Sequence, residues 1–140
     1  ITELSIVDQS EFTARALSKF CDMGVQLQID DFGIGYSSLS YLSRFPINAL
    51  KIDKSFVSRM EEERTQKNII RAIITLTEQL NVDVIAEGIE TQHQLGELAE
   101  LGCNLGQGYL ISQPLDTSEI ESALASMPKD EIGNLFWKQD

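Results

Sequence analysis

Hydrophobic and polar residues follow two alternating periods along this chain, one typical of helices and one typical of strands. The apolar residues within 12–21 recur at helical spacing, and Gly24 then stands where a helix commonly ends. Residues 25–32 alternate with a period of two, with apolar side chains on one face and polar side chains on the other. The pattern therefore predicts a helix, a tight turn and a strand.

The same succession repeats to the end of the chain. We expect a short helix over 36–45, a strand over 48–53, a long helix within 57–80, a strand over 82–87, a helix ending at Gly102, a strand over 104–109 and a last helix to Met127. Capping boxes are predicted at three helix starts, from the pairs Asp8 and Glu11, Thr91 and Gln94, and Asp116 and Glu119.

Strands that alternate with helices are typical of an α/β fold with parallel strands. A doubly wound sheet and a (β/α) barrel both fit. The polar face of each strand favours the barrel, because a doubly wound sheet is covered by helices on both faces. We expect one domain over 1–127 and a C-terminal tail over 128–140.

The composition narrows the possible partners. The 140 residues carry a formal net charge of −11, which argues against sequence-independent binding to DNA, RNA or anionic membranes. No apolar stretch has the length of a membrane-spanning helix. Cys21 and Cys103 lie far apart without neighbouring cysteines, which favours two free thiols in a reducing cytoplasm over a disulfide.

Polar residues gather where the predicted strands end, at Asp30 and Asp31, Lys51, Glu87 and Gln107. The carboxyl ends of parallel strands are where α/β proteins build active sites. Carboxylates held together repel one another unless a cation is present, and Mg²⁺ or Mn²⁺ prefers such oxygen ligands. Lys51 is suited to orient a water molecule or neutralise a phosphate. Helix capping by Asp30 or Asp31, and a structural salt bridge of Lys51 to Asp31 or Glu87, remain the alternatives.

Residues next to these strand ends have less certain roles. Asp53 and Glu90 fit site support and helix capping about equally well. Gly33 and Gly35 predict a flexible turn, which is no dinucleotide fingerprint because the third glycine of that motif is absent. His93 falls at a helix start and is expected on the surface.

Four segments in register resemble the EAL domain of bacterial cyclic-di-GMP phosphodiesterases: DDFGIGYSSL, LKIDKSF, IAEGIET and GCNLGQGYLISQPL. The resemblance extends from Ile1 to Leu115. It implies a modified TIM barrel that hydrolyses cyclic di-GMP to linear pGpG by a two-metal mechanism with Mg²⁺ or Mn²⁺. The metals would also mediate between this acidic chain and an anionic dinucleotide.

The resemblance also implies roles for individual residues. The metal ligands would be Asp30, Asp31 and Glu87, and the catalytic residues Lys51, Glu87 and Gln107. Substrate binding or loop support would fall to Glu3, Gly33, Gly35, Asp53 and Glu90.

The sequence departs from the family pattern in two ways. The Glu-Ala-Leu signature and two further metal ligands are absent from it, while Ile34 and Gln113 replace residues more usual in the family. We therefore expect the C-terminal part of a barrel, inactive alone, that covers its open side by homo-oligomerisation or element exchange. The parent protein would be a cytoplasmic or membrane-tethered phosphodiesterase, with a possible upstream sensory or diguanylate cyclase domain. The alternative is a non-catalytic module that acts as a cyclic-di-GMP receptor or binds a protein.

Overall fold

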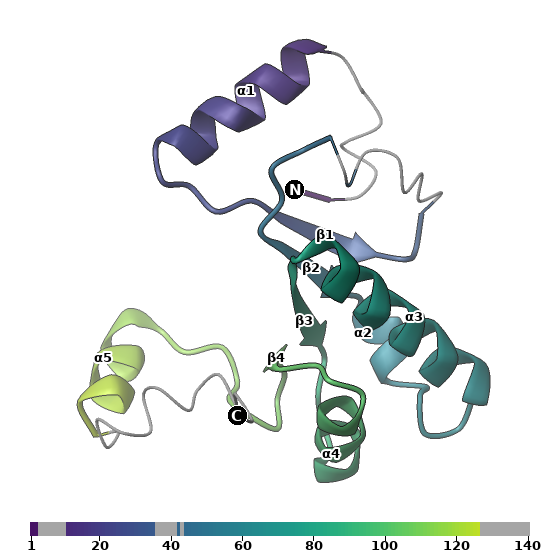
Figure 1. Cartoon of the computed structure of the whole chain (residues 1–140). Helices are drawn as coiled ribbons and strands as arrows, with labels where there is room; N and C mark the ends of the chain where they lie inside the picture. The colour runs from purple at the N-terminus through teal and green to yellow at the C-terminus, as the bar shows by residue number, and fades with distance from the viewer. Residues whose placement is uncertain (3–10, 36–41, 43, 127–140) are drawn as a thin grey trace.

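The computed structural model describes residues 1–2, 11–35, 42 and 44–126. Strands and helices alternate along these residues (Figure 1). In chain order the elements are α1 (Glu11–Asp22), β1 (Gln28–Phe32), β2 (Ala49–Ile52), α2 (Lys54–Val57), α3 (Arg64–Leu80), β3 (Asp83–Glu87), α4 (Gln92–Glu100), β4 (Leu105–Gln107) and α5 (Thr117–Ser126).

The four strands form one parallel sheet in the order β1-β2-β3-β4. Each strand lies beside its successor in the chain, and the order does not reverse. A doubly wound sheet contains such a reversal, whereas a (β/α) barrel adds every strand on the same side. The described strands thus have the arrangement of an arc of a TIM-like barrel, and the prediction of an α/β fold is confirmed.

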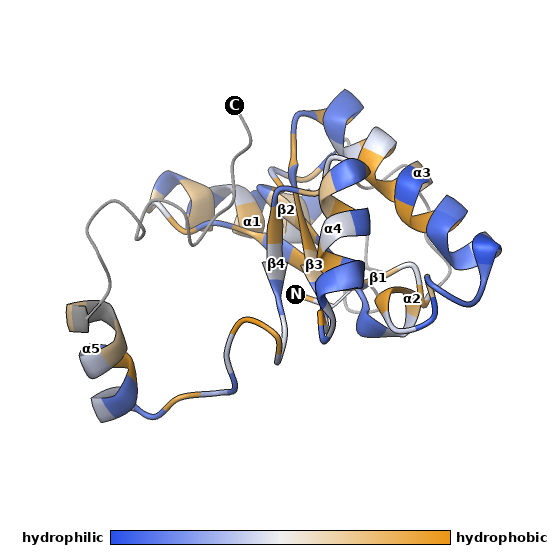
Figure 2. Cartoon of the chain, turned by 90° about the horizontal axis from the view of Figure 1, so that it is seen from below, coloured by the Kyte–Doolittle hydropathy of each residue, from blue (hydrophilic) through white to orange (hydrophobic). Residues whose placement is uncertain are grey.

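The hydrophobic core lies between one face of this sheet and its covering helices. Leu50 and Val84 are partners in register, as are Ile52 and Ala86, and all four are buried. Helix α3 contacts β2 and β3, and α2 contacts β3 and α3. Ile70, among other residues, faces the core from α3. In Figure 2 the strands are largely hydrophobic in colour, whereas much of α3 is hydrophilic.

The opposite face of the sheet is more polar. Lys51 lies in register with Ile85, and Glu87 lies in register with Gln107. Lys51, Ile85 and Glu87 are half-buried rather than buried. The two faces therefore differ as the period-two pattern predicted, and the polar face leads to the strand ends.

Most predicted elements are present, with shorter bounds. The first strand begins at Gln28 rather than at residue 25, and Val25 is 46% exposed. The long helix, Arg64–Leu80, lies within the predicted range 57–80 and begins after turns at residues 58–62. The helix predicted over 36–45 lies mostly outside the described residues, as do the capping pair of Asp8 with Glu11 and the tail over 128–140.

Local signals at the helix ends are confirmed. Thr91 and Gln94 form a reciprocal capping box at the start of α4. At the start of α5, the amide of Asp116 donates a hydrogen bond of 2.8 Å to Oε2 of Glu119. The amide of Glu119 in turn donates one of 2.9 Å to Oδ1 of Asp116. Gly102 has a φ of 89°, a conformation that suits the end of α4.

Two further predictions concern the chain as a whole. Cys21 and Cys103 are both free, and Cys103 is buried. Within the part of the chain that the structure describes, none of the helices combines the length and apolar character needed to cross a bilayer.

Candidate metal centre at the strand ends

Three carboxylates from two strands converge at the carboxyl end of the sheet. Asp30 and Asp31 come from β1 and Glu87 is the last residue of β3. One oxygen of each carboxylate lies within 4.8 Å of the others. All three residues are half-buried, so the cluster is shielded from water on part of its surface.

A β-bulge explains how two consecutive residues reach the same cluster. Ile29 pairs with Leu50 but Phe32 pairs with Ile52, so β1 contains one extra residue between these two pairs. The extra residue falls at Asp30 and Asp31, and Asp31 has a φ of 57°. In a regular strand these neighbours would point to opposite faces of the sheet. The bulge turns both carboxylates toward Glu87.

Lys51 inserts its ammonium group among these carboxylates. Its Nζ lies 2.9 Å from Oδ1 of Asp30 and also forms an ion pair with Oε1 of Glu87. Desolvation lowers the pKa of Lys51, but the hydrogen bonds and negative charges of Glu87 and Asp30 outweigh it and leave the pKa raised. The ammonium form is therefore the stable one in this site. The salt-bridge alternative from the sequence is thus realised, with Asp30 and not Asp31 as the aspartate partner.

Gln107 extends the cluster onto β4. Its Nε2 donates a hydrogen bond of 2.8 Å to Oε1 of Glu87, the same oxygen that Lys51 contacts. The loops that follow β3 and β4 are held together behind this pair, because Ile89 donates to the carbonyl of Gln107 and accepts from the amide of Leu110. A Cβ at Gly108 would lie 2.1 Å from the carbonyl oxygen of Ile89. Only glycine fits this close backbone contact.

A pocket of about 550 Å³ opens beside Gln107. Lys54 and Glu90 contribute opposite charges to its wall, and Tyr109 contributes an aromatic ring that is 66% exposed. The sequence analysis singled out Glu90 and Gln107 but missed Lys54 and Tyr109. The glycines on either side of Gln107 were the available signal that the backbone makes a close approach here.

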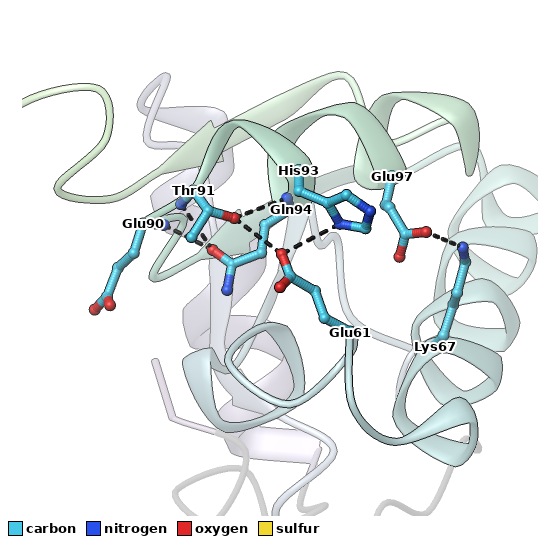
Figure 3. A network of polar contacts seen from close by, with 7 residues as sticks. All are labelled: Glu61, Lys67, Glu90, Thr91, His93, Gln94 and Glu97. Carbon is cyan, nitrogen blue, oxygen red and sulfur yellow. Dashed lines mark hydrogen bonds and ion pairs between the residues drawn. The ribbon is translucent and has the colours of Figure 1, made fainter.

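Polar contacts hold the loop that carries Glu90 (Figure 3). Oε1 of Gln94, a buried side chain, accepts hydrogen bonds from the amides of Glu90 and Thr91 at 2.8 and 3.1 Å. Oγ1 of Thr91 donates to Oε1 of Glu61, which also lies 3.2 Å from Nδ1 of His93. Glu90 is thus attached to a fixed backbone, and His93 lies on the surface as predicted.

Three of the remaining predicted site residues, Asp53, Gly33 and Gly35, follow the ends of β1 and β2. Asp53 is buried, and its Oδ1 caps α2 by accepting a hydrogen bond of 2.8 Å from the amide of Ser55. Gly33 has a φ of 100° and lies against the ring of Phe56. Gly35 follows it in a bend. Glu3 lies outside the described residues.

The donor set of the cluster fits a hard divalent cation. It consists of carboxylate oxygens, which suit Mg²⁺ and Mn²⁺, and contains neither thiolate nor imidazole. The cluster holds three negatively charged carboxylates, and the single positive charge of Lys51 neutralises only part of that charge. Asp30, Asp31 and Glu87 are therefore the residues that could hold a metal ion.

Comparison with known proteins identifies the family to which these features belong. The sequence model of the EAL domain matches residues 1–114. The chain is 43% identical over 124 residues to the cyclic di-GMP phosphodiesterase NbdA of Pseudomonas aeruginosa. The matched region covers 89% of this chain and 16% of NbdA. It is 38% identical over 125 residues to the bifunctional diguanylate cyclase/cyclic di-GMP phosphodiesterase MucR of the same organism, which covers 89% of the chain and 18% of MucR.

Solved structures give the same result. The EAL domain of Mycobacterium smegmatis DcpA matches with a TM-score of 0.85 and 40% identity, over 91% of this chain and 58% of that one. The MucR phosphodiesterase in complex with c-di-GMP matches with a TM-score of 0.81 and 38% identity, over 86% of this chain and 49% of that one. Klebsiella pneumoniae BlrP1 with manganese and cyclic di-GMP matches with a TM-score of 0.74 and 34% identity. This match covers 81% of this chain and 29% of BlrP1. The chain thus spans about half of the first two structures and about a sixth of the curated relatives.

Proposed function

The chain belongs to the EAL domain family, and on that premise we propose that the protein carrying it hydrolyses one phosphodiester bond of cyclic di-GMP to give linear pGpG. The observation that carries this proposal is the convergence of Asp30, Asp31 and Glu87 at the strand ends, with Lys51 among them. Support comes from NbdA, a cyclic di-GMP phosphodiesterase, and from MucR, a bifunctional diguanylate cyclase/cyclic di-GMP phosphodiesterase.

The proposed chemistry is a two-metal hydrolysis. Two divalent cations, Mg²⁺ or Mn²⁺, would when bound neutralise charge on the reacting phosphate and activate water for attack. Asp30, Asp31 and Glu87 would hold them through their clustered oxygens. The bulge in β1 orients the two aspartates for this task before any ligand arrives. The relative BlrP1, solved with manganese and cyclic di-GMP, supports a divalent cation in this family.

Lys51 and Gln107 would act on the reacting groups from opposite sides of Glu87. The raised pKa of Lys51 keeps its ammonium group charged, so it can donate to a phosphate oxygen or orient the attacking water. Gln107 holds the Glu87 carboxylate by a hydrogen bond of 2.8 Å. The adjoining pocket of about 550 Å³, with Lys54 and Glu90 in its wall, offers space for the nucleotide next to these groups.

We assign the activity to the whole protein, because about half of each solved EAL structure named first has no counterpart in this chain. The 140-residue chain alone is expected to be inactive. The test is chromatography of cyclic di-GMP and pGpG after incubation of the whole protein with Mg²⁺ or Mn²⁺. Replacing Glu87 with Gln should abolish pGpG formation, while replacing the exposed Glu100 with Gln should not. Unchanged turnover in Glu87→Gln would contradict the proposal.

The second candidate is a receptor that binds cyclic di-GMP without hydrolysing it. The pocket beside Gln107, with Lys54 and Glu90 in its wall, would serve such a receptor as well as an enzyme. Equilibrium dialysis with radiolabelled cyclic di-GMP, combined with the chromatography, separates the two. Binding by the whole protein with no pGpG in the presence of either metal would establish the receptor.

A further inference from the structure

Lys51 contacts two of the three carboxylates that a metal ion would need. Its ammonium group bridges Oδ1 of Asp30 and Oε1 of Glu87, two of the three residues in the carboxylate cluster. A carboxylate oxygen has two lone pairs, and Oε1 of Glu87 directs both at donors, because it accepts from Gln107 as well as from Lys51. Lys51 and a metal ion therefore compete for these oxygens.

The electrostatics of the cluster favour this bridge when metal is absent. The side chains of Lys51 and Glu87 are only 16% and 14% exposed, so water screens their charges weakly. Without a cation, three carboxylates within 4.8 Å would repel one another and spread apart. The ammonium group offsets part of that repulsion and holds Asp30 and Glu87 in place.

We propose, building on the proposed function, that Lys51 is a built-in counter-ion that metal binding displaces. In the metal-free protein its ammonium group holds the cluster together. When Asp30 and Glu87 hold a divalent cation, they would release the ammonium group of Lys51, which would then be free to face the substrate phosphate. Loading of metal and exposure of Lys51 are therefore one coupled event, and Lys51 acts as a positioning residue before it acts on substrate.

The test is a titration of the full chain with MnCl₂, in which free Mn²⁺ is followed by electron paramagnetic resonance. Lys51→Met removes the charge but keeps most of the side-chain length, whereas Lys51→Arg keeps the charge. Lys19→Met, an exposed change on α1, controls for the altered net charge. We expect Lys51→Met to bind Mn²⁺ about tenfold more tightly than the unaltered chain, since a cation next to the ligands has been removed. Lys51→Arg and Lys19→Met should stay close to the unaltered affinity.

Thermal unfolding followed by circular dichroism gives the second measurement. Without metal, Lys51→Met should melt at a lower temperature than Lys19→Met, and MnCl₂ should restore it where NaCl of equal ionic strength does not. Equal or weaker Mn²⁺ binding by Lys51→Met, an unchanged melting temperature, or no Mn²⁺ binding by any variant would overturn the inference. Failure of the proposed function is distinguishable, because it appears as absent pGpG formation in the whole protein while Lys51→Met still binds Mn²⁺ more tightly.

Discussion

At the scale of single residues, the candidate site depends on side chains whose surroundings alter their ordinary behaviour. Asp31 adopts a left-handed backbone conformation that few residues other than glycine, asparagine and aspartate tolerate. Lys51 is charged although it is largely buried. Such departures gather at functional sites because the surrounding structure maintains them.

Asp31 allows its charge to be tested separately from its backbone conformation. Asp31→Asn removes the charge but keeps a residue that adopts a positive φ, so the melting temperature should change little while Mn²⁺ affinity falls at least about tenfold. Asp31→Ala should lose the same affinity and also about 1 kcal/mol of stability, through backbone strain. Calorimetric titration and urea unfolding measure the two effects. Asp83→Asn, an exposed change at the start of β3, is the control and should leave both unaltered. Mn²⁺ affinity retained in Asp31→Asn would contradict the assignment of Asp31 as a ligand.

Because Cys103 is a buried thiol, we expect the stability of the fold to depend on pH under alkaline conditions. Burial raises the pKa of this thiol from 9.0 to about 11, and outweighs the opposing hydrogen bonds from the backbone at Leu105 and Ala86. The folded state therefore favours the neutral thiol. This contribution is fully present below pH 9.0 and is lost as the pH rises through about 11.

The expected size is about 2–3 kcal/mol, since each unit of pKa shift corresponds to about 1.4 kcal/mol. Urea unfolding between pH 8 and pH 11 should show a steeper loss of stability in the unaltered chain than in Cys103→Ala. Cys21→Ala controls for the loss of a thiol elsewhere. Parallel stability curves for the unaltered chain and Cys103→Ala would show that the buried thiol does not titrate in this window.

At the scale of elements, the sequence predicted the strands, helices and helix ends, because these depend on local periodicity and on capping residues. The strands, the capping box at Thr91 and the glycine at the end of α4 follow from such signals, and all are present. The gathering of polar groups at the strand ends was also predictable, because parallel strands end at one edge of the sheet. Long-range packing sets the rest. The choice of Asp30 as partner of Lys51 depends on the bulge, and the contact between Gly108 and Ile89 depends on two loops from different strands.

Two glycines separate the effect of this loop contact from that of glycine in general. Gly108→Ala would place a methyl group 2.1 Å from a backbone oxygen and should destabilise the chain by more than about 2 kcal/mol. Gly96→Ala, inside α4 with no atom within 4 Å of the new methyl group, should instead stabilise it by about 0.5–1 kcal/mol. Urea unfolding measures both. Similar effects of the two substitutions would mean that the loops after β3 and β4 are not tightly joined.

At the scale of the whole molecule, the described residues expose an apolar stripe along one helix. Phe12, Phe20 and Met23 share a face of α1 and its following turn, and they are 81%, 49% and 77% exposed. In Figures 1 and 2, α5 lies away from the sheet, in keeping with the exposure of its first two turns. Exposed apolar patches of this kind mark surfaces that associate with other surfaces.

We expect the chain to self-associate through the stripe on α1. Multi-angle light scattering should give a mass above that of one chain and a dependence on concentration. Phe12→Ser combined with Met23→Ser should lower the mass toward that of a monomer, because less apolar area is buried on association. Arg71→Ser, an exposed change on α3, should leave it unaltered. A monomer at every concentration in the unaltered chain would contradict the expectation.

The bulge in β1 has a consequence for how this site can change over generations. The extra residue decides which face of the sheet each side chain at the end of β1 points to. The cluster therefore depends on the number of residues there as well as on their identity. Deleting either aspartate would leave two of the three carboxylates, one aspartate and Glu87, and would also restore regular alternation in β1. Drift by point mutation can weaken the cluster stepwise, whereas an in-frame deletion at this codon pair would abolish it at once. The number of residues in this strand end is therefore as much a requirement of the cluster as the carboxylates themselves.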